Sequence, residues 1–353
     1  MSLDSLRKKI DSIDARMIDL LNERAALCQE IGQHKLKSRK GIYAPAREKQ
    51  VLENIRKLNK GPMTAEAFEA IYREIMSSSL ALEKPLQIAY LGIDGSYTHL
   101  AANKKFGSQV DYLPCDTVLD VFQQVESDDC DYGVVPIENS TEGVVTHTID
   151  MLVDSELKIC AQILMKISHN LVSKVSLRQV KKIYSNPQVF GQCRNWLHKN
   201  IPGAALVPCE STSKAAQKAA KEKQTGAICS SLAAQIYGLK VLKSNIQDIA
   251  HNSTRFLVIA KQDVPATGRD RTTILFSIKD KAGALHAMLT PFLKHKINLT
   301  KIESRPSKKR AWDYYFFVDF EGHRTDRKVK LALSQLENMC KYLKVVGSYP
   351  VVD

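Results

Sequence analysis

Between residues 85 and 265 the chain repeats one pattern four times: an apolar strand runs into a polar turn, and a helix follows. The turns are rich in hydroxyl and amide side chains and span 92–99, 138–141, 185–192 and 209–214. Strands that alternate with helices favour mainly parallel sheets, with the turns at the strand ends. The region therefore predicts an α/β fold whose polar turns lie on two lobes facing a cleft.

The second of these turns shows the chemistry that such a junction offers. Tyr132 to Val135 is an apolar strand that we expect Pro136 to end, and Glu138 to Thr141 form the turn before the next helix. A helix that starts after such a turn leaves backbone N–H groups pointing at one spot, where an anion can bind. An ordinary capped strand–helix junction without a ligand is the alternative that the pattern leaves open.

The first 84 residues predict three helices, and the first of them is long. Its apolar residues are spaced by three and four in a heptad-like seam, which is too long for its own domain to bury. We therefore expect a second copy of the chain to cover it. Arg24 stands at a seam position, where a buried charge is costly unless an anion meets it, although a surface or register role is the alternative. The apolar seam residues are Leu3, Leu6, Ile10, Ile13, Met17, Leu20, Leu27 and Ile31.

The second and third helices carry their own signals. Pro45 is expected to open the second helix and Thr64 to cap the third. Ser79 and Glu83 continue an otherwise apolar face of the third helix, which is typical of a polar pocket.

Several of these positions together resemble the all-helical chorismate mutase domain, over residues 1 to 84. The resemblance implies a site shared across an intertwined dimer, into which the first-helix arginine reaches from the partner chain. Guanidinium groups would bind the two carboxylates of chorismate, and Lys35 and Glu83 would donate to the ether oxygen that breaks. Some relatives have Asp where this chain has Ala44, so Glu48 is the expected partner of the substrate hydroxyl. The residues that carry the match and would bind chorismate are Arg7, Arg24, Lys35, Arg47, Glu48, Ser79 and Glu83.

The repeated units resemble the prephenate dehydratase domain over residues 85 to 265, with two lobes like those of a periplasmic binding protein. The motifs are Gly95–His99, Val135–Ser140, Ser185 with Gln188 and Gln192, Glu210–Ser213, Tyr237–Leu239 and Thr254–Phe256. Prephenate loses its ring carboxylate and its ring hydroxyl together, so the site must hold two carboxylates and help hydroxide leave as water.

The resemblance implies a role for single residues of this domain. The Thr254 hydroxyl would lie beside the leaving group as a donor, assisted by Asn139 and by helix N-termini. Arg255 could equally anchor the turn in an ion pair, and Glu138 would orient its neighbours. His99 and His251 are expected to be structural. The residues expected to bind prephenate are Ser96, Tyr97, Thr98, Glu138, Asn139, Ser140, Ser185, Gln188, Gln192, Ser213, Thr254 and Arg255.

Residues 272 to 353 predict a smaller module after a polar linker. Its strands and helices follow the order βαββαβ, which favours a ferredoxin-like α+β sandwich. The module resembles the ACT domain in the form that binds phenylalanine after a prephenate dehydratase, and a scaffold that only dimerises is the alternative. The residues expected to bind phenylalanine are Gly283, Ala284, Leu285, Glu303, Ser304, Arg305 and Pro306.

The composition of the chain limits the kinds of ligand and partner that it can bind. The net charge of +13 suits small polyanionic substrates such as chorismate and prephenate, whereas no nucleic-acid motif and no transmembrane run is present. The eight cysteines form no C-x-x-C pair, which favours a cytoplasmic protein without zinc.

The sequence thus predicts a bifunctional enzyme that converts chorismate through prephenate to phenylpyruvate, with no metal or organic cofactor and with feedback inhibition by L-phenylalanine. We expect a homo-oligomer, either a dimer through the helical domain or a tetramer. The alternative is a non-catalytic protein that senses aromatic acids.

Overall fold

The computed structural model describes residues 2–37, 43–249, 251–278, 282–306 and 314–351. The chain forms two compact units, Met1–Leu86 with Phe106–Asp111, and Gln87–Lys105 with Tyr112–Asp353.

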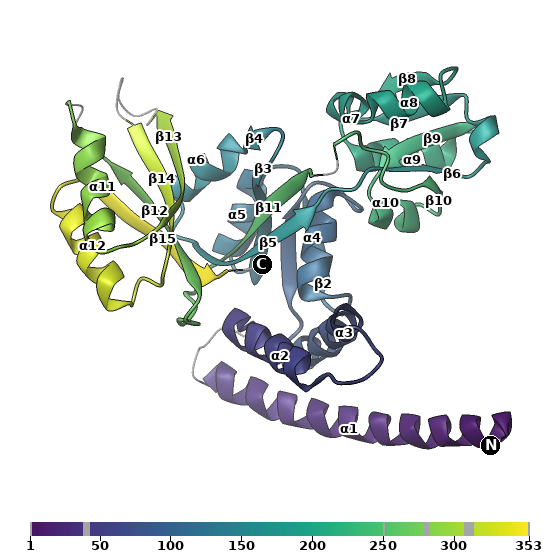
Figure 1. Ribbon diagram of the computed structural model, residues 1–353, viewed down its shortest axis with the longest axis horizontal. Coiled ribbons are helices and arrows are strands. Elements are labelled where there is room, and N and C mark those ends of the chain that lie inside the picture. Colours follow the sequence, from purple (N-terminus) through teal and green to yellow (C-terminus); the bar gives the residue numbers. More distant parts are fainter. Residues whose placement is uncertain (1, 38–42, 250, 279–281, 307–313, 352–353) are drawn as a thin grey trace. The chain divides into compact units, whose positions relative to one another are not determined.

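The first unit is helical, as predicted. It contains α1 (Leu3–Lys37), α2 (Pro45–Leu58) and α3 (Ala65–Glu83) (Figure 1). Pro45 occupies the first turn of α2, where its missing N–H costs nothing. The Thr64 side chain accepts a hydrogen bond from the Ala67 N–H at 3.2 Å, so the predicted cap of α3 is confirmed.

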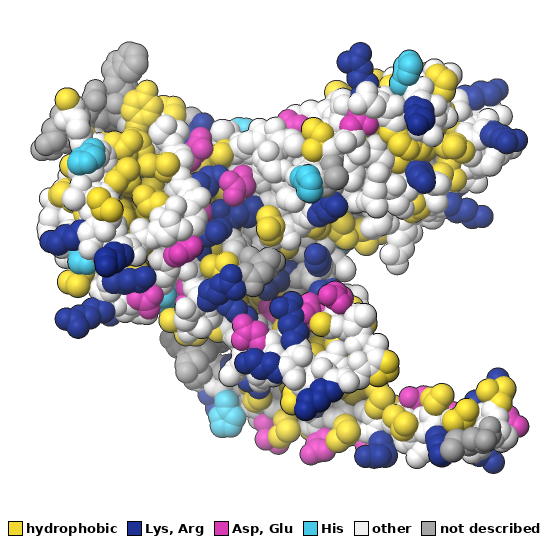
Figure 2. Space-filling model, in the orientation of Figure 1, with side chains coloured by type: hydrophobic (Ala, Val, Ile, Leu, Met, Phe, Trp, Pro, Cys, Tyr) yellow, Lys and Arg dark blue, Asp and Glu magenta, His cyan; other side chains and the backbone are white. Residues whose placement is uncertain are grey.

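The apolar seam of α1 is uncovered in the single chain. With 35 residues the helix is about 52 Å long at ~1.5 Å per residue. Its apolar side chains are exposed along this length, and Leu20 retains 60% of its accessible surface (Figure 2). Burial of such a stripe would remove a large apolar area from water.

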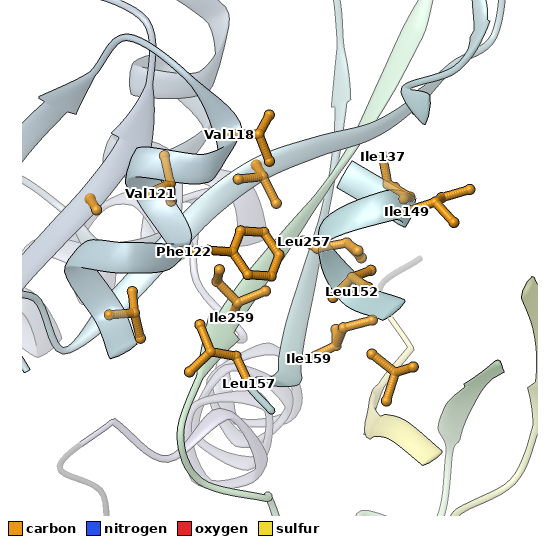
Figure 3. Packing of buried hydrophobic residues seen from close by; sticks show 14 of the residues in the cluster. Val118, Val121, Phe122, Ile137, Ile149, Leu152, Leu157, Ile159, Leu257 and Ile259 are labelled. Atoms are coloured by element: carbon orange, nitrogen blue, oxygen red, sulfur yellow. The ribbon is translucent and has the colours of Figure 1, made fainter. Parts of the chain in front are cut away.

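The second unit begins with an α/β lobe built on one mixed sheet. Its main strands lie in the order β2 (Asp111–Cys115), β1 (Gln87–Leu91), β3 (Tyr132–Asn139), β11 (Ser253–Ala260) and β5 (Lys158–Lys166), and β4 (Gly143–Val144) pairs with β3. The helices of this lobe are α4 (Tyr97–Phe106), α5 (Val118–Glu126) and α6 (Thr146–Asp154). Phe122 of α5 points toward Leu257 and Ile259 of β11 in the buried core (Figure 3).

The second lobe has its own sheet in the order β10 (Lys240–Lys243), β6 (Asn170–Ser173), β9 (Thr225–Cys229), β7 (Lys182–Ser185) and β8 (Ala205–Pro208). Buried alanines of α9, among them Ala215 and Ala219, pack in the same core as Ala227 of β9. Its helical segments are η1 (Leu177–Gln179), α7 (Pro187–Gln192), α8 (Arg194–Asn200), α9 (Thr212–Lys221) and α10 (Ser231–Ile236).

The expectation of mainly parallel sheets was wrong. Strand β11 is antiparallel to both β3 and β5, and β6 is antiparallel to both β9 and β10. The chain crosses between the lobes twice, after β5 and before β11, so the returning strand enters the first sheet in the opposite direction.

The expectation that Pro136 ends its strand was also wrong, because β3 continues to Asn139. Pro136 lies opposite Phe256, next to a shift in the register of β3 against β11. A strand tolerates the missing N–H of proline at such an irregularity. The continuation matters for the site because it makes Glu138 and Asn139 strand residues.

The C-terminal part of the unit has the predicted βαββαβ order. It comprises β12 (Asp270–Ser277), α11 (Ala284–Lys294), β13 (Leu299–Pro306), β14 (Tyr314–Glu321), α12 (Arg327–Glu337) and β15 (Tyr342–Pro350). The sheet order is β13-β14-β12-β15 with antiparallel pairs throughout.

The two faces of this sheet have different partners. Both helices pack on one face, against Phe276 and Phe320 among others (Figure 1). The opposite face contributes Leu275, Phe317 and Val346 to the core of the first α/β lobe. The βαββαβ module and that lobe therefore share one hydrophobic core.

Among the described residues, no helix combines the length and the apolarity that crossing a bilayer requires.

Candidate active sites

In the helical unit, α1 and α3 bring four of the predicted polar residues together. Lys35 Nζ lies 2.7 Å from Glu83 Oε2, and the Glu83 side chain is only 7% exposed. Arg24 Nη1 donates to Ser79 Oγ at 2.5 Å, and Ser79 Oγ donates to the carbonyl of Ile75. The result is a cationic, half-buried face with hydrogen-bonding groups at fixed positions.

Gly32 allows α1 to approach α3 at this point. A Cβ on Gly32 would lie 2.9 Å from the Cβ of Glu83, closer than real Cβ contacts allow. The missing side chain therefore sets the position of Glu83 relative to Lys35.

Residues of α2 lie in the same unit but have other partners. Arg47 Nη1 donates to Gln50 Oε1 at 2.7 Å on the exposed side, and Tyr43 OH donates to Glu48 Oε2 at 2.6 Å. Both bonds therefore join residues within the segment 43–50.

The remaining predicted residue, Arg7, is distant from this group. Arg7 is exposed and lies 3.7 Å from Asp4. Along a straight helix, the 28 residues from Arg7 to Lys35 span about 42 Å. One chain therefore cannot bring Arg7 to the Lys35–Glu83 pair.

In the α/β unit, Thr254 and Asn139 face each other across β11 and β3. They are register partners, and Asn139 Nδ2 donates to Thr254 Oγ1 at 2.7 Å. Asn139 Oδ1 accepts from the N–H groups of Thr141 and Glu142, so the amide orientation is fixed. Because the Thr254 oxygen accepts this bond, its own proton remains available to another acceptor.

The two lobes are joined at this point by the predicted glutamines. Gln188 Nε2 and Gln192 Nε2 donate to the two carboxylate oxygens of Glu142, at 3.1 and 3.0 Å. Glu142 follows β3, whereas both glutamines belong to α7 of the second lobe. Asn252 links the glutamines to Asn139, because its Nδ2 donates to Gln192 Oε1 and its Oδ1 accepts a hydrogen bond from Asn139 Nδ2.

A buried histidine that we did not predict lies in the same network. His169 Nε2 is 2.6 Å from Gln192 Oε1, and Nδ1 is 2.8 Å from Tyr97 OH. Gln192 already donates through its nitrogen, so His169 Nε2 must be the donor and Nδ1 the acceptor. Burial lowers the pKa of His169, although the bond to Gln192 opposes this shift, and burial raises the pKa of Tyr97 well above its usual range.

Other predicted prephenate residues have local structural bonds. Ser96 Oγ accepts from the His99 N–H, Ser140 Oγ donates to the carbonyl of His251, and Ser185 Oγ donates to that of Ile228. Thr98 is buried on α4. Ser213 Oγ at the start of α9 is buried without a hydrogen-bond partner in the described part of the chain.

The two histidines expected to be structural behave differently. His99 Nδ1 accepts from the Gly95 N–H at 3.1 Å and its ring stacks on Tyr90, as a structural residue does. His251 is exposed, and its carbonyl accepts the hydrogen bond from Ser140 Oγ.

Glu138 and Arg255 do not lie with Thr254. Arg255 Nη1 contacts Glu138 at 3.2 Å and Asp319 at 2.6 Å, and Glu138 also pairs with Lys301. Burial alone would raise the pKa of Glu138, but the ion pairs with Lys301 and Arg255 lower it. Both residues serve the contact with β13 and β14 and not a cleft between the lobes.

The residues predicted to bind phenylalanine form two groups. Gly283, Ala284 and Leu285 stand at the start of α11, and Leu285 is 37% exposed. The second group lies along β13, where Arg305 Nη2 contacts Asp150 of α6 at 3.1 Å. Glu303 and Arg305 are half-buried, whereas Ser304 and Pro306 are exposed.

Sequence reasoning missed Glu142, His169, Lys301 and Asp319. No spacing rule could find them, because their partners lie between 23 and 163 positions away. The sequence signal for His169 was weak: it is a single histidine between two apolar segments.

Fold and geometry define a class of protein: a multidomain protein with one cluster of polar side chains in a helical unit and another in an α/β unit, followed by a βαββαβ module. Family models agree with this division. The model for chorismate mutase type II matches residues 6–84, that for prephenate dehydratase residues 88–264, and that for the ACT domain residues 272–338.

Known proteins match at the scale of the whole chain. The bifunctional chorismate mutase/prephenate dehydratase of Aquifex aeolicus is 49% identical over 353 residues, which covers 99% of this chain and 98% of that one. The structure of a prephenate dehydratase from Arthrobacter aurescens in complex with L-Phe has a TM-score of 0.70 at 33% identity, and the match covers 75% of this chain and 90% of that one. A structure titled as GqqA, a novel type of quorum-quenching acylase, also has a TM-score of 0.70, at 26% identity, over 75% of this chain and 98% of that one.

The chain belongs to the family of bifunctional chorismate mutase/prephenate dehydratases with a C-terminal ACT domain. It is an enzyme that rearranges chorismate to prephenate and converts prephenate to phenylpyruvate. The non-catalytic sensor considered above is not favoured. Since one fold can host different activities, this conclusion rests on the match of all three domains in order and not on the fold alone.

Proposed function

We propose that chorismate is bound and rearranged at the face formed by Arg24, Lys35, Ser79 and Glu83. The Lys35–Glu83 contact of 2.7 Å supports this assignment, because it places two donors to an ether oxygen side by side when Glu83 is protonated. The reaction is unimolecular, so it requires only orientation and stabilisation of the developing charge. The guanidinium group of Arg24 binds a substrate carboxylate, with Arg47 and Glu48 of α2 closing on the remaining groups.

A second copy of the chain completes this site. The exposed seam of α1 is the surface that the copies share, and the distance of Arg7 from Lys35 along α1 suits an arginine that acts in the partner's site. The two chains then form an intertwined dimer, and further association to a tetramer is compatible with it.

For the dehydratase we propose that Thr254 donates its hydroxyl proton to the ring hydroxyl of prephenate, which leaves as water while the ring carboxylate leaves as CO₂. The Asn139 N–H stabilises the Thr254 oxygen until it regains a proton from solvent. The single observation that carries this role is the 2.7 Å bond from Asn139 Nδ2 to Thr254 Oγ1. A bond accepted by the oxygen makes the hydroxyl a better donor and directs its proton away from Asn139. Gln188, Gln192 and Tyr97 hold the two lobes around the substrate, and Ser213 binds one of its oxygens.

The regulatory part of the proposal concerns the ACT domain. We propose that L-phenylalanine binds at the start of α11, where free N–H groups suit a carboxylate, and against β13 of another subunit. The structure of the Arthrobacter aurescens relative in complex with L-Phe supports the choice of ligand. Bound phenylalanine would shift the equilibrium between subunit arrangements, and prephenate analogues must change its affinity by the same factor.

Two substitutions at Thr254 test the assignment of the donor. Valine keeps the shape but lacks the hydroxyl, so Thr254→Val should lower kcat for prephenate by ~10²–10³. Thr254→Ser keeps the hydroxyl and should retain most of kcat. If the valine variant forms phenylpyruvate at the normal rate, Thr254 is not the donor.

A further inference from the structure

The two strands that carry Thr254 have a second polar pair on their opposite face. In the register of β11 with β3, Thr254 stands opposite Asn139 and Arg255 opposite Glu138. Successive side chains of a strand point to opposite faces, so the Thr254–Asn139 bond and the Arg255–Glu138 ion pair lie on the two sides of one sheet. Only the thickness of the sheet separates the proposed proton donor from Arg255.

The partner of Arg255 on that side comes from the ACT domain. In β14, Val318 and Phe320 pack with the ACT helices, whereas Phe317 belongs to the core of the first α/β lobe. Asp319 shares the face of Phe317 and is 0% exposed.

Asp319 and its neighbours hold the Arg255 guanidinium from several directions. Asp319 Oδ2 lies 2.6 Å from Arg255 Nη1, and Asp319 Oδ1 accepts from Thr273 Oγ1 at 2.6 Å. Arg255 Nη2 donates to Tyr349 OH at 2.7 Å. Arg255 is itself 5% exposed, so its charge depends on these protein groups and not on bulk water, and its Nε has no hydrogen-bond partner among the described residues.

A buried guanidinium that loses its anionic partner is left uncompensated and must move or draw in water. Any displacement of the Arg255 backbone also moves Thr254, because their Cα atoms are only ~3.8 Å apart along one strand. A displacement of about 1 Å at a reacting group can cost ~10²-fold in rate.

We propose that Asp319 is a positioning residue for the dehydration of prephenate. By holding Arg255 it fixes the first residues of β11, and so the position of the Thr254 hydroxyl. The ACT domain thus completes the dehydratase site within the same chain, whether or not phenylalanine is bound. This inference rests on the role proposed for Thr254.

The test is Asp319→Asn in the full-length protein, which keeps the shape and removes the charge. We expect kcat for prephenate to fall ~10–10²-fold, with KM changed less than about threefold. Mutase turnover measures the other domain of the same sample and should remain at the wild-type rate.

A matched control separates positioning from a general loosening of the ACT contact. Lys344 of β15 is also buried, and its Nζ donates to the carbonyls of Val153 and Ser155 in the same lobe. Lys344→Met breaks this contact without touching Arg255, and should leave kcat within about twofold of wild type. An equal loss of kcat in both variants would overturn the proposal.

A double-mutant cycle tests whether Asp319 acts through Arg255. The Asp319→Asn/Arg255→Gln variant should be no slower than Arg255→Gln alone, since the two residues work as one unit. If the two losses multiply, Asp319 does not act through Arg255. The cycle tests the coupling of Asp319 to Arg255 even if Thr254→Val shows that another group is the donor. The hypothesis on Asp319 and the hypothesis on Thr254 can therefore fail separately.

A milder variant covers the case in which Asp319→Asn does not fold. Tyr349→Phe removes only the hydroxyl that accepts from Arg255 Nη2 and contacts Thr273. It should lower kcat in the same direction by ~3–10-fold while KM stays constant. An unchanged kcat in Tyr349→Phe would count against the inference.

Discussion

At the scale of single residues, the Lys35–Glu83 pair depends on a position without a side chain. Gly32 lets α1 approach the backbone of α3 at Glu83, and a Cβ there would contact three carbon atoms of Glu83 at 2.9–3.0 Å. These atoms include the Cα, so the contact cannot be relieved by side-chain rotation alone.

We therefore predict that Gly32→Ala lowers mutase kcat by about tenfold or more, because Glu83 is displaced from Lys35. Dehydratase turnover of the same protein should not change. Gly61→Ala is the control, since the nearest atom to its added Cβ is 4.0 Å away. Equal mutase rates in the two alanine variants would contradict the role given to Gly32.

His169 supplies a pH dependence with a definite sign. Burial lowers its pKa in the folded state below the usual 6.5, so the unfolded chain binds a proton first as the pH falls. The stability contributed by neutral His169 is thus present above the unfolded pKa and is lost as the pH falls from that value toward the folded pKa.

The corresponding experiment compares thermal unfolding of the wild type with that of His169→Asn between about pH 7 and pH 5. The Tm of the wild type should fall more steeply with acid than that of the variant. Parallel curves would show that His169 does not titrate between the two states.

The residues that the sequence predicted lie in local motifs, whereas the residues that it missed are defined by contacts between distant elements. Thr254, Asn139, Lys35 and Glu83 stand in local motifs, so family resemblance identified them and the structure brings them into two groups. Glu142 was not predicted, because its partners Gln188 and Gln192 come from the other lobe. Contacts between distant elements leave no periodicity in the sequence, and only the fold reveals them.

At the scale of elements, α1 is defined by the surface that it leaves exposed. Leu20 and Met17 are 60% and 51% exposed in the single chain. The apolar spacing predicted this helix correctly, because periodicity along one helix is a local property, and the pairing of its seam with a second copy stays a prediction. The directions of β6 and β11 could not be predicted in the same way, since they depend on where the chain crosses between lobes.

We predict that Leu20→Glu weakens the proposed dimer, because it places a charge in the shared apolar seam. Sedimentation should show a shift toward monomer, and mutase activity should fall with it because Arg7 of the partner is lost. Glu23→Lys changes charge without removing a seam residue and serves as the control. A Leu20→Glu variant that sediments like the wild type would remove α1 from the interface.

At the scale of the whole molecule, the ACT domain cannot simply be cut away to test regulation. Leu275, Phe317, Val346 and Tyr349 belong to the core of the first α/β lobe, so deletion of residues 272–353 would expose that core. Substitutions on the surface of α11 test the phenylalanine site without this damage.

Leu285→Asp places a negative charge at the start of α11, where the carboxylate of phenylalanine is proposed to bind. We predict that phenylalanine no longer inhibits the dehydratase of this variant, whereas turnover without phenylalanine is retained. Leu293→Asp, near the other end of the same helix and 80% exposed, is the control and should remain inhibited. Inhibition that persists unchanged in Leu285→Asp, and that prephenate relieves by competition, would place phenylalanine in the dehydratase site.

We propose that the two reactions take place at two separate sites, the mutase site in the helical unit and the dehydratase site in the α/β unit. The most direct measurement assays both activities, chorismate consumption and phenylpyruvate formation from supplied prephenate, in Lys35→Ala and in Thr254→Ala. We predict that Lys35→Ala loses mutase turnover by ~10²-fold or more and keeps the dehydratase, and that Thr254→Ala shows the reverse. Loss of both activities in either folded variant, or retention of the activity assigned to the substituted residue, would contradict the account.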